Sequence, residues 1–90
     1  MIKSEIINAI TAKVVSTPYN IWRIGLTHDL VERKLTWRVI ERLDVTHWSD
    51  WQADSLSDAQ DIETFFSKTG MEGGTGGDLS PDKTTFVYVF

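Results

Sequence analysis

The sequence predicts an α+β domain, in which about three helices flank a small mixed sheet of about three strands. Residues 4–15, 29–43 and 58–69 repeat apolar side chains at the three- and four-residue spacing of amphipathic helices. Residues 19–26 and 84–90 alternate in the manner of strands. Ninety residues suffice for one small core, so we expect a single domain over 1–90.

Composition and charge argue against several classes of protein. A net charge of −4 opposes a general attraction to nucleic acid, so any such binding must be local. Five of the cations fall between Arg23 and Arg42, where they form either a basic face or the solvated side of a helix. No apolar run is long enough to span a bilayer, no signal peptide is evident and cysteine is absent. We therefore expect a cytoplasmic protein without a membrane partner.

The first helix is expected over residues 4–15, with Ser4 as its N-cap. Thr17 and Pro18 end it, because proline disfavours helical geometry in the residue before it. This helix covers the sheet through apolar positions at helical spacing: Ile6, Ile7, Ile10 and Val14.

The strand over residues 19–26 places Arg23 and Gly25 on one face, and Trp22 and Ile24 on the other. Gly25 allows a tight turn or the close approach of another group, because it has no Cβ.

The second helix is expected from about Asp29 to about Leu43. Asp29 and Glu32 have the spacing of an N-cap and its reciprocal carboxylate. An apolar stripe at intervals of four is predicted to face the core: Val31, Leu35, Val39 and Leu43.

A further strand is expected within residues 45–54, with Trp48 and Trp51 on opposite faces. Ser57 begins a capping box for the helix over 58–69, which Gly70 ends, with Met71 placed for an apolar contact. The apolar positions of this helix are Ala59, Ile62, Phe65 and Phe66.

Four glycines lie within residues 73–77, which predicts a crossover loop in preference to a phosphate cradle, since no helix pattern follows them. Residues 80–83 read as a turn. The strand over 84–90 is apolar on both faces and is predicted to be central in the sheet.

Residues 23–33, Arg-Ile-Gly-Leu-Thr-His-Asp-Leu-Val-Glu-Arg, resemble the second half of a GIY-YIG nuclease domain. That half is a strand ending in Tyr-Ile-Gly, a short turn and a helix with a phosphate-facing arginine. Residues 59–66 resemble the later helix of the family, whose glutamate holds a divalent metal. The resemblance implies that Arg33 is the catalytic arginine and that Glu63 is the ligand of Mg²⁺ or Mn²⁺.

No Gly-Ile-Tyr strand precedes this stretch, and Arg23 stands in place of the tyrosine of the second motif. Residues 86–90 fill the place of the missing strand if the domain is circularly permuted, since chain termini often lie close together. Tyr88 then replaces the lost tyrosine, with Tyr19 as the alternative. His28 or His47 is the candidate for activating water.

Two functions follow as hypotheses. The first is metal-dependent phosphodiester cleavage, with Arg33, Tyr88 and His28 as catalytic residues and Glu63 as metal ligand. The second is a non-catalytic interaction module that binds a protein or nucleic acid partner. The alternative for Arg33 is an ion pair on its own helix, and for Glu63 a solvated helix position. Whether the chain is an enzyme stays open.

Four tryptophans are many for a chain of this length, so we expect some to be partly exposed. Exposed aromatic side chains and the apolar terminal strand lead us to expect a homodimer.

Overall fold

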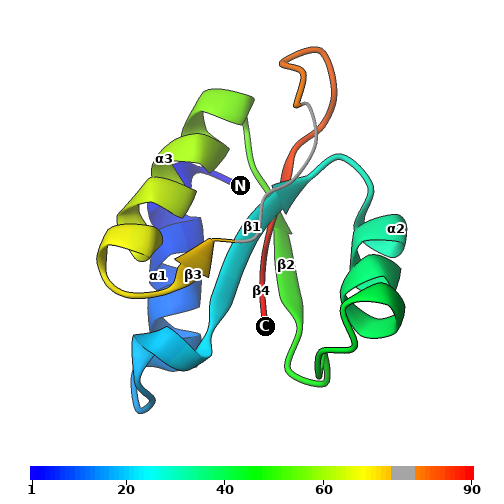
Figure 1. Ribbon diagram of the computed structural model, residues 1–90. Helices are drawn as coiled ribbons and strands as arrows, with labels where there is room; N and C mark the ends of the chain where they lie inside the picture. Colours follow the sequence, from blue (N-terminus) through cyan, green and yellow to red (C-terminus); the bar gives the residue numbers. More distant parts are fainter. Residues whose placement is uncertain (74–78) are drawn as a thin grey trace.

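The computed structural model describes residues 1–73 and 79–90 (Figure 1). In chain order, the elements are α1 (Lys3–Val14), the 3₁₀ turn η1 (Tyr19–Ile21), β1 (Arg23–Thr27), α2 (Leu30–Leu35), the π-helical turn η2 (Thr36–Ile40), β2 (Ser49–Gln52), α3 (Leu56–Lys68), β3 (Glu72–Gly73) and β4 (Phe86–Val89). The predicted α+β class is confirmed. None of the described helices has the length and apolar character needed to cross a bilayer.

The sheet has four strands in the order β2-β4-β1-β3, one more than the sequence predicts. The strand β4 pairs antiparallel with both β1 and β2, whereas the added strand β3 pairs parallel with β1. The predicted central position of the terminal strand is therefore confirmed. Because both edges of β4 are paired within the chain, this strand has no free edge for the homodimer contact predicted for it.

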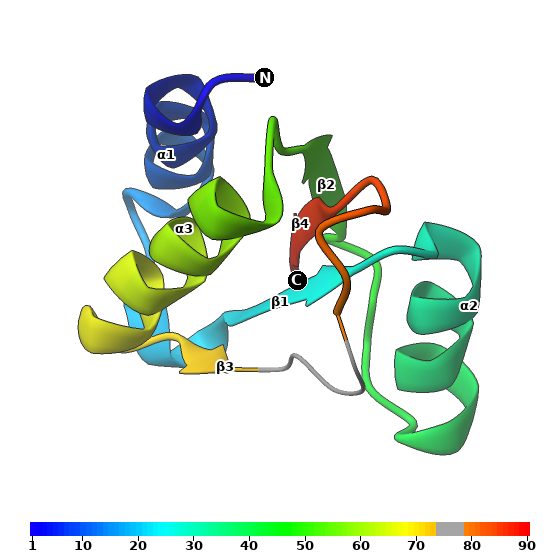
Figure 2. The ribbon, with the colours of Figure 1, turned by 90° about the horizontal axis from the view of Figure 1, so that it is seen from above.

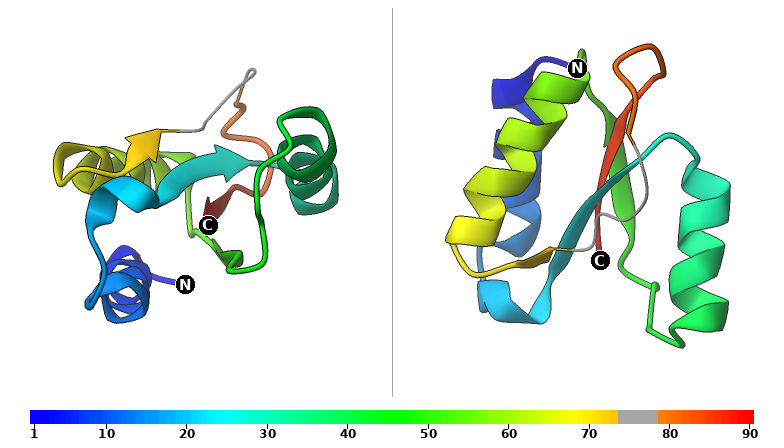
Figure 3. Two further views of the ribbon diagram at one scale, coloured as in Figure 1. Left: turned by 60° about the horizontal axis from the view of Figure 1, so that its bottom comes forward. Right: turned by 45° about the horizontal axis from the view of Figure 1, so that its top comes forward.

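Helices lie on both faces of the sheet. Figures 2 and 3 show α1 and α3 together on one side of the strands and α2 on the other. The first face holds the larger core, to which α1, β1, α3 and β4 contribute Ile6, Ile10, Val14, Ile24, Leu26, Ala59, Ile62, Phe66, Val87 and Val89. The second face holds a smaller aromatic cluster: Val45, Tyr88 and Phe90 with Trp37, Leu43 and Trp48. The predicted opposite faces of Trp48 and Trp51 are confirmed by their places in the two clusters.

Two boundaries near the N-terminal end differ from the prediction. The helix α1 begins at Lys3, with Ile2 at its N-cap and no side-chain bond there, so the prediction of Ser4 as the cap is wrong. Residues 19–21 form the turn η1 after Pro18 in place of the predicted strand start. The turn arises because the Ile21 and Trp22 amides donate to the carbonyls of Pro18 and Tyr19.

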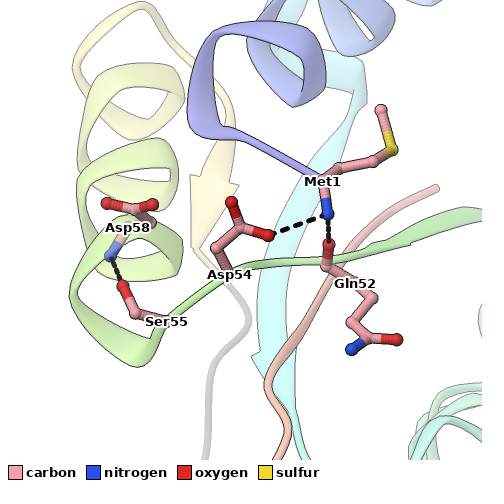
Figure 4. A network of polar contacts seen from close by, with 5 residues as sticks. All are labelled: Met1, Gln52, Asp54, Ser55 and Asp58. Atoms are coloured by element: carbon pink, nitrogen blue, oxygen red, sulfur yellow. Dashed lines mark hydrogen bonds and ion pairs between the residues drawn. The ribbon is translucent and has the colours of Figure 1, made fainter.

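The helix α3 begins two residues earlier than the capping box predicts. Ser55, not Ser57, is the N-cap, and its hydroxyl accepts the Asp58 amide at 3.0 Å (Figure 4). Beside it, the Met1 amino nitrogen donates to the Gln52 carbonyl at 3.0 Å and ties the start of α1 to the end of β2. The predicted C-terminal end is confirmed, since Gly70 has φ 122° and Met71 is buried.

The segment after Asp29 departs most from the prediction. The Asp29 N-cap is confirmed, because its carboxylate accepts the Glu32 amide at 3.0 Å. The predicted core-facing stripe is wrong for three of its four residues: Val31, Leu35 and Val39 are 81%, 47% and 55% exposed, whereas Leu43 packs on the aromatic cluster. The α-helix ends at Leu35 and continues as the π turn η2, and the side that meets the sheet carries polar and aromatic groups.

A residue with positive φ ends this segment. Arg42 has φ 57°, which costs a residue with a Cβ more than it costs glycine. We expect Arg42→Gly to raise the free energy of unfolding by about 0.7 kcal/mol in urea denaturation. Arg38→Gly, inside η2, serves as the control and lowers it by about 1 kcal/mol. A destabilising Arg42→Gly would contradict this account.

The loop between η2 and β2 contains a turn in which the Asp44 side chain accepts hydrogen bonds. The Thr46 hydroxyl and then the Thr46 amide donate to its carboxylate, which lowers the pKa of Asp44 below the usual aspartate range. This bonding contributes to stability above the ordinary aspartate pKa, and the contribution is lost as pH falls through the lowered pKa. We expect Thr46→Val to raise the pKa of Asp44 in a carboxyl-carbon NMR titration, whereas Thr64→Val leaves it unchanged. An unchanged pKa in Thr46→Val would contradict the assignment.

The predicted glycine-rich crossover loop falls largely on residues 74–78, outside the described residues. The predicted turn after it is confirmed, since the Lys83 amide donates to the Ser80 carbonyl at 3.2 Å.

Candidate functional site

Tyr88 is the centre of the aromatic cluster on the second face of the sheet. Its side chain is fully buried, and its ring stacks on Trp48 at a centroid distance of 4.5 Å and an interplanar angle of 6°. Gly25 is its partner in the register of β1 and β4. A Cβ at Gly25 would lie 2.3 Å from the Tyr88 hydroxyl oxygen, so the predicted close approach at this glycine is confirmed.

The Tyr88 hydroxyl joins the sheet to α2 and η2. It accepts a hydrogen bond from Trp37 Nε1 at 2.9 Å and another from Arg33 Nε at 3.3 Å. The π turn accommodates Trp37 here: the Glu41 amide donates to the Thr36 carbonyl, five residues back. Turns of this kind are rare and occur frequently at functional sites.

Arg33 is held at more than one point. Its guanidinium carbon lies 5.6 Å from the centre of the Trp37 ring, and that of Arg23 lies 5.3 Å from the same ring. Contact with an aromatic ring together with the bond through Nε restricts the rotamers of Arg33. A guanidinium held in this way loses little entropy when it binds an anion.

Arg33 lines a cleft of about 440 Å³ beside the end of β1. The cleft carries two cations, Arg33 and Lys83, and two carboxylates, Asp29 and Glu32. Its other lining residues are Thr27, His28 and Leu79. The cleft therefore offers charged groups of both signs to a ligand of modest size.

His28 connects the end of β1 to the segment before β4. Its Nε2 accepts the Ser80 amide at 2.8 Å, so in the neutral ring Nδ1 carries the proton and donates to the Thr84 carbonyl at 2.9 Å. Both ring nitrogens are thus bonded to the backbone. This arrangement favours a positioning role for His28 at the cleft.

We expect His28→Ala to lower the free energy of unfolding by about 1.5 kcal/mol, because it removes both hydrogen bonds to the segment before β4. Urea denaturation followed by tryptophan fluorescence measures the change. His47→Ala, at an exposed histidine, is the matched control and changes stability by less than about 0.5 kcal/mol. Equal effects of the two substitutions would contradict the role of His28.

The other predicted site residues lie elsewhere. Glu63 is half-buried on α3, and it does not line the cleft. The helix α3 lies on the face of the sheet opposite to α2 (Figure 1). Tyr19 packs near Phe66 on that same face, with a ring distance of 6.3 Å, and His47 is exposed. The structure thus brings Arg33, Tyr88 and His28 to one region and leaves Glu63 apart.

A metal ion at the cleft would need several His, Cys, Asp or Glu side chains close together. Residues 1–73 and 79–90 contain no group of three His, Cys, Asp or Glu side chains that could hold an ion. Because Glu63 also lies apart from Arg33, these residues do not assemble a metal centre at the cleft.

Two contributors to the site were missed in the sequence. Trp37 follows Arg33 by four residues, the spacing at which helical side chains meet, and this spacing was the available signal. No sequence pattern could have predicted that Lys83 lies at the cleft, because its position depends on how the segment before β4 folds back. The prediction of partly exposed tryptophans is confirmed, since all four are half-buried.

No protein-family model, curated protein or solved structure matches the chain.

Proposed function

We propose that the cleft binds a phosphate group of a nucleic acid and that the domain is a non-catalytic binding module. The observation that supports this proposal is the anchored Arg33, which lines the cleft together with Lys83. Guanidinium and ammonium groups are the side chains that bind phosphate oxygens best. Trp37 and Tyr88 hold the guanidinium in place before the ligand arrives.

The charge distribution limits what this cleft binds. The chain has a net charge of −4, so a long polyanion gains no general attraction from it. Asp29 and Glu32 lie in the cleft and would repel a second phosphate. We therefore expect contact with one phosphate and a shallow dependence of affinity on salt, with a log–log slope of about −1.

Fluorescence anisotropy with labelled single-stranded, duplex and branched DNA and RNA tests this function in the absence of divalent ions. We expect Arg33→Gln and Lys83→Gln each to weaken binding by about tenfold. Arg38→Gln is the matched control, because it removes the same charge from an exposed side chain outside the cleft. Equal weakening in Arg38→Gln, or no binding to any probe, would reject the proposal.

A second function, metal-dependent phosphodiester cleavage, has one specific observation in its favour. Arg33 is the arginine that the resemblance to GIY-YIG nucleases implies, and Tyr88 is the tyrosine that a circular permutation would supply; the two are in contact at 3.3 Å. The place of β4 beside β1 is compatible with a circularly permuted domain. Incubation of the same nucleic acids with Mg²⁺ or Mn²⁺ tests for cleavage. Activity lost in both Glu63→Gln and Arg33→Gln would establish a nuclease, whereas activity retained in both would indicate a contaminant.

A further inference from the structure

The segment α2–η2 carries apolar side chains that the described chain leaves uncovered. Val31 and Ile40 are 81% and 72% exposed, and Leu35 and Val39 lie between them along the same segment. Neither α2 nor η2 contains a buried residue. We call these four residues the apolar stripe. A contiguous exposed stripe on a helix is typical of a surface that a partner covers.

Two cations border the apolar stripe. Lys34 and Arg38 line a shallow groove of about 270 Å³ together with Val31 and Leu35. They also border a second hollow of about 450 Å³ on their other side, lined by residues 43–46. The groove therefore combines an apolar wall with two positive charges.

These two cations have no carboxylate partner among the described residues. The ion pairs there use the Met1 amino group, Lys3 and Arg23 as cations. Asp44 borders the second hollow, but its carboxylate is bonded to Thr46. Lys34 instead lies 5.8 Å from the centre of the Trp48 ring. A ligand with carboxylates would supply the missing counter-charges.

Charge also distinguishes between two possible partners of the apolar stripe, a second copy of the chain and an acidic segment of another protein. Residues 30–42 carry four cations against two carboxylates, whereas the whole chain has a net charge of −4. A symmetric contact between the stripes of two copies would bring two positive segments together, which is unfavourable. An acidic occupant has the complementary charge.

We propose that the apolar stripe is the docking site for an acidic amphipathic segment of a partner protein. Apolar side chains of that segment pack on Val31 and Leu35, and its flanking carboxylates pair with Lys34 and Arg38. This is the helix-in-groove mode of peptide recognition. The inference is independent of the proposed phosphate cleft, because Arg33 takes no part in the groove.

A peptide-display selection against the whole chain tests the proposal. Short helical peptides vary over Leu, Ile, Met and Phe at the apolar positions, and over Asp, Glu, Lys, Arg, Gln and Ser at the flanking positions. We expect the enriched peptides to carry Asp and Glu at the flanks. The best of them, as synthetic labelled peptides, should bind the double variant Val31→Asn/Leu35→Asn about tenfold more weakly.

The double variant Lys34→Gln/Arg38→Gln should also weaken binding and reduce its dependence on salt. The matched control is Val15→Asn/Ile21→Asn, which removes two exposed apolar side chains elsewhere, 71% and 64% exposed, and should leave binding unchanged. Circular dichroism and urea denaturation verify that each variant remains folded.

Three outcomes would overturn the proposal. The first is a selection that enriches no peptide, or enriches peptides without a preference for acidic flanks. The second is sedimentation velocity that detects a dimer of the chain lost in the Val31→Asn/Leu35→Asn variant, which would assign the apolar stripe to a second copy. The third is loss of labelled DNA binding in that variant, which would assign the stripe to nucleic acid.

Discussion

Gly25→Ala is expected to lower the free energy of unfolding by about 3 kcal/mol, the largest effect we expect from a single substitution. The added Cβ would lie 2.3 Å from the hydroxyl oxygen and 2.4 Å from the ring carbon Cζ of Tyr88. Tyr88 is fully buried and stacked on Trp48, so its ring has no free direction in which to move. Urea denaturation followed by tryptophan fluorescence measures the change.

Gly73→Ala is the control for this prediction. A Cβ at Gly73 would lie 3.8 Å from its nearest neighbour, the Ser67 hydroxyl oxygen, which is an ordinary contact. We expect a change below about 0.5 kcal/mol there. In the Gly25→Ala background, Tyr88→Leu should recover part of the lost stability, because the smaller side chain relieves the clash. Equal effects at the two glycines would contradict the close approach of Tyr88 to Gly25.

Tyr88→Phe is expected to lower the free energy of unfolding by about 2 kcal/mol. The substitution keeps the stacked ring and removes the hydroxyl that accepts the Trp37 indole N–H and the Arg33 Nε–H. A donor that loses its acceptor in a buried setting costs more than an average hydrogen bond contributes. The same variant also frees Arg33 from one of its anchors, so nucleic acid binding should weaken by a smaller factor than in Arg33→Gln.

Tyr19→Phe is the control for Tyr88→Phe. The Tyr19 hydroxyl makes no hydrogen bond to the rest of residues 1–73 and 79–90, so we expect a change below about 0.5 kcal/mol. Urea denaturation gives the stability of both variants, and the anisotropy assay gives their affinities. An equal loss of stability in the two variants would contradict the claim that the Tyr88 hydroxyl stabilises the fold more than the Tyr19 hydroxyl does. Unchanged affinity for nucleic acid in Tyr88→Phe would show that the Tyr88 hydroxyl does not contribute to binding at the cleft.

Several confirmed predictions rest on sequence patterns that act over a few residues. The spacing of Ile6, Ile10 and Val14 predicted the buried side of α1, because residues four apart lie on one face of a helix. Asp29 caps α2 through a contact within its own first turn. Gly70 ends α3 because its positive φ is a property of the local backbone. Each of these features depends on neighbours within a few residues.

Some failed predictions were local, namely the caps at Ser4 and Ser57 and the strand start at residues 19–21. The others depended on distant partners. Spacing placed Val31, Leu35 and Val39 on one side of the helix, but it did not identify the side that meets the sheet. That side is decided by hydrogen bonds to Tyr88 from Arg33 and Trp37, 55 and 51 residues away. The strand β3 was missed because two residues form no periodic pattern, and it exists through its pairing with β1.

For this protein, the sequence by itself determined the fold class, the helices α1 and α3, the central place of β4 and the role of Gly25 as a point of close approach. The tertiary structure alone decided which side of α2 is exposed, where Lys83 lies and that Glu63 stands apart from Arg33. The physical reason is the range of the interactions. Helix caps and amphipathic spacing act within a few residues, whereas the cleft is assembled by contacts between segments that only the folded chain brings together.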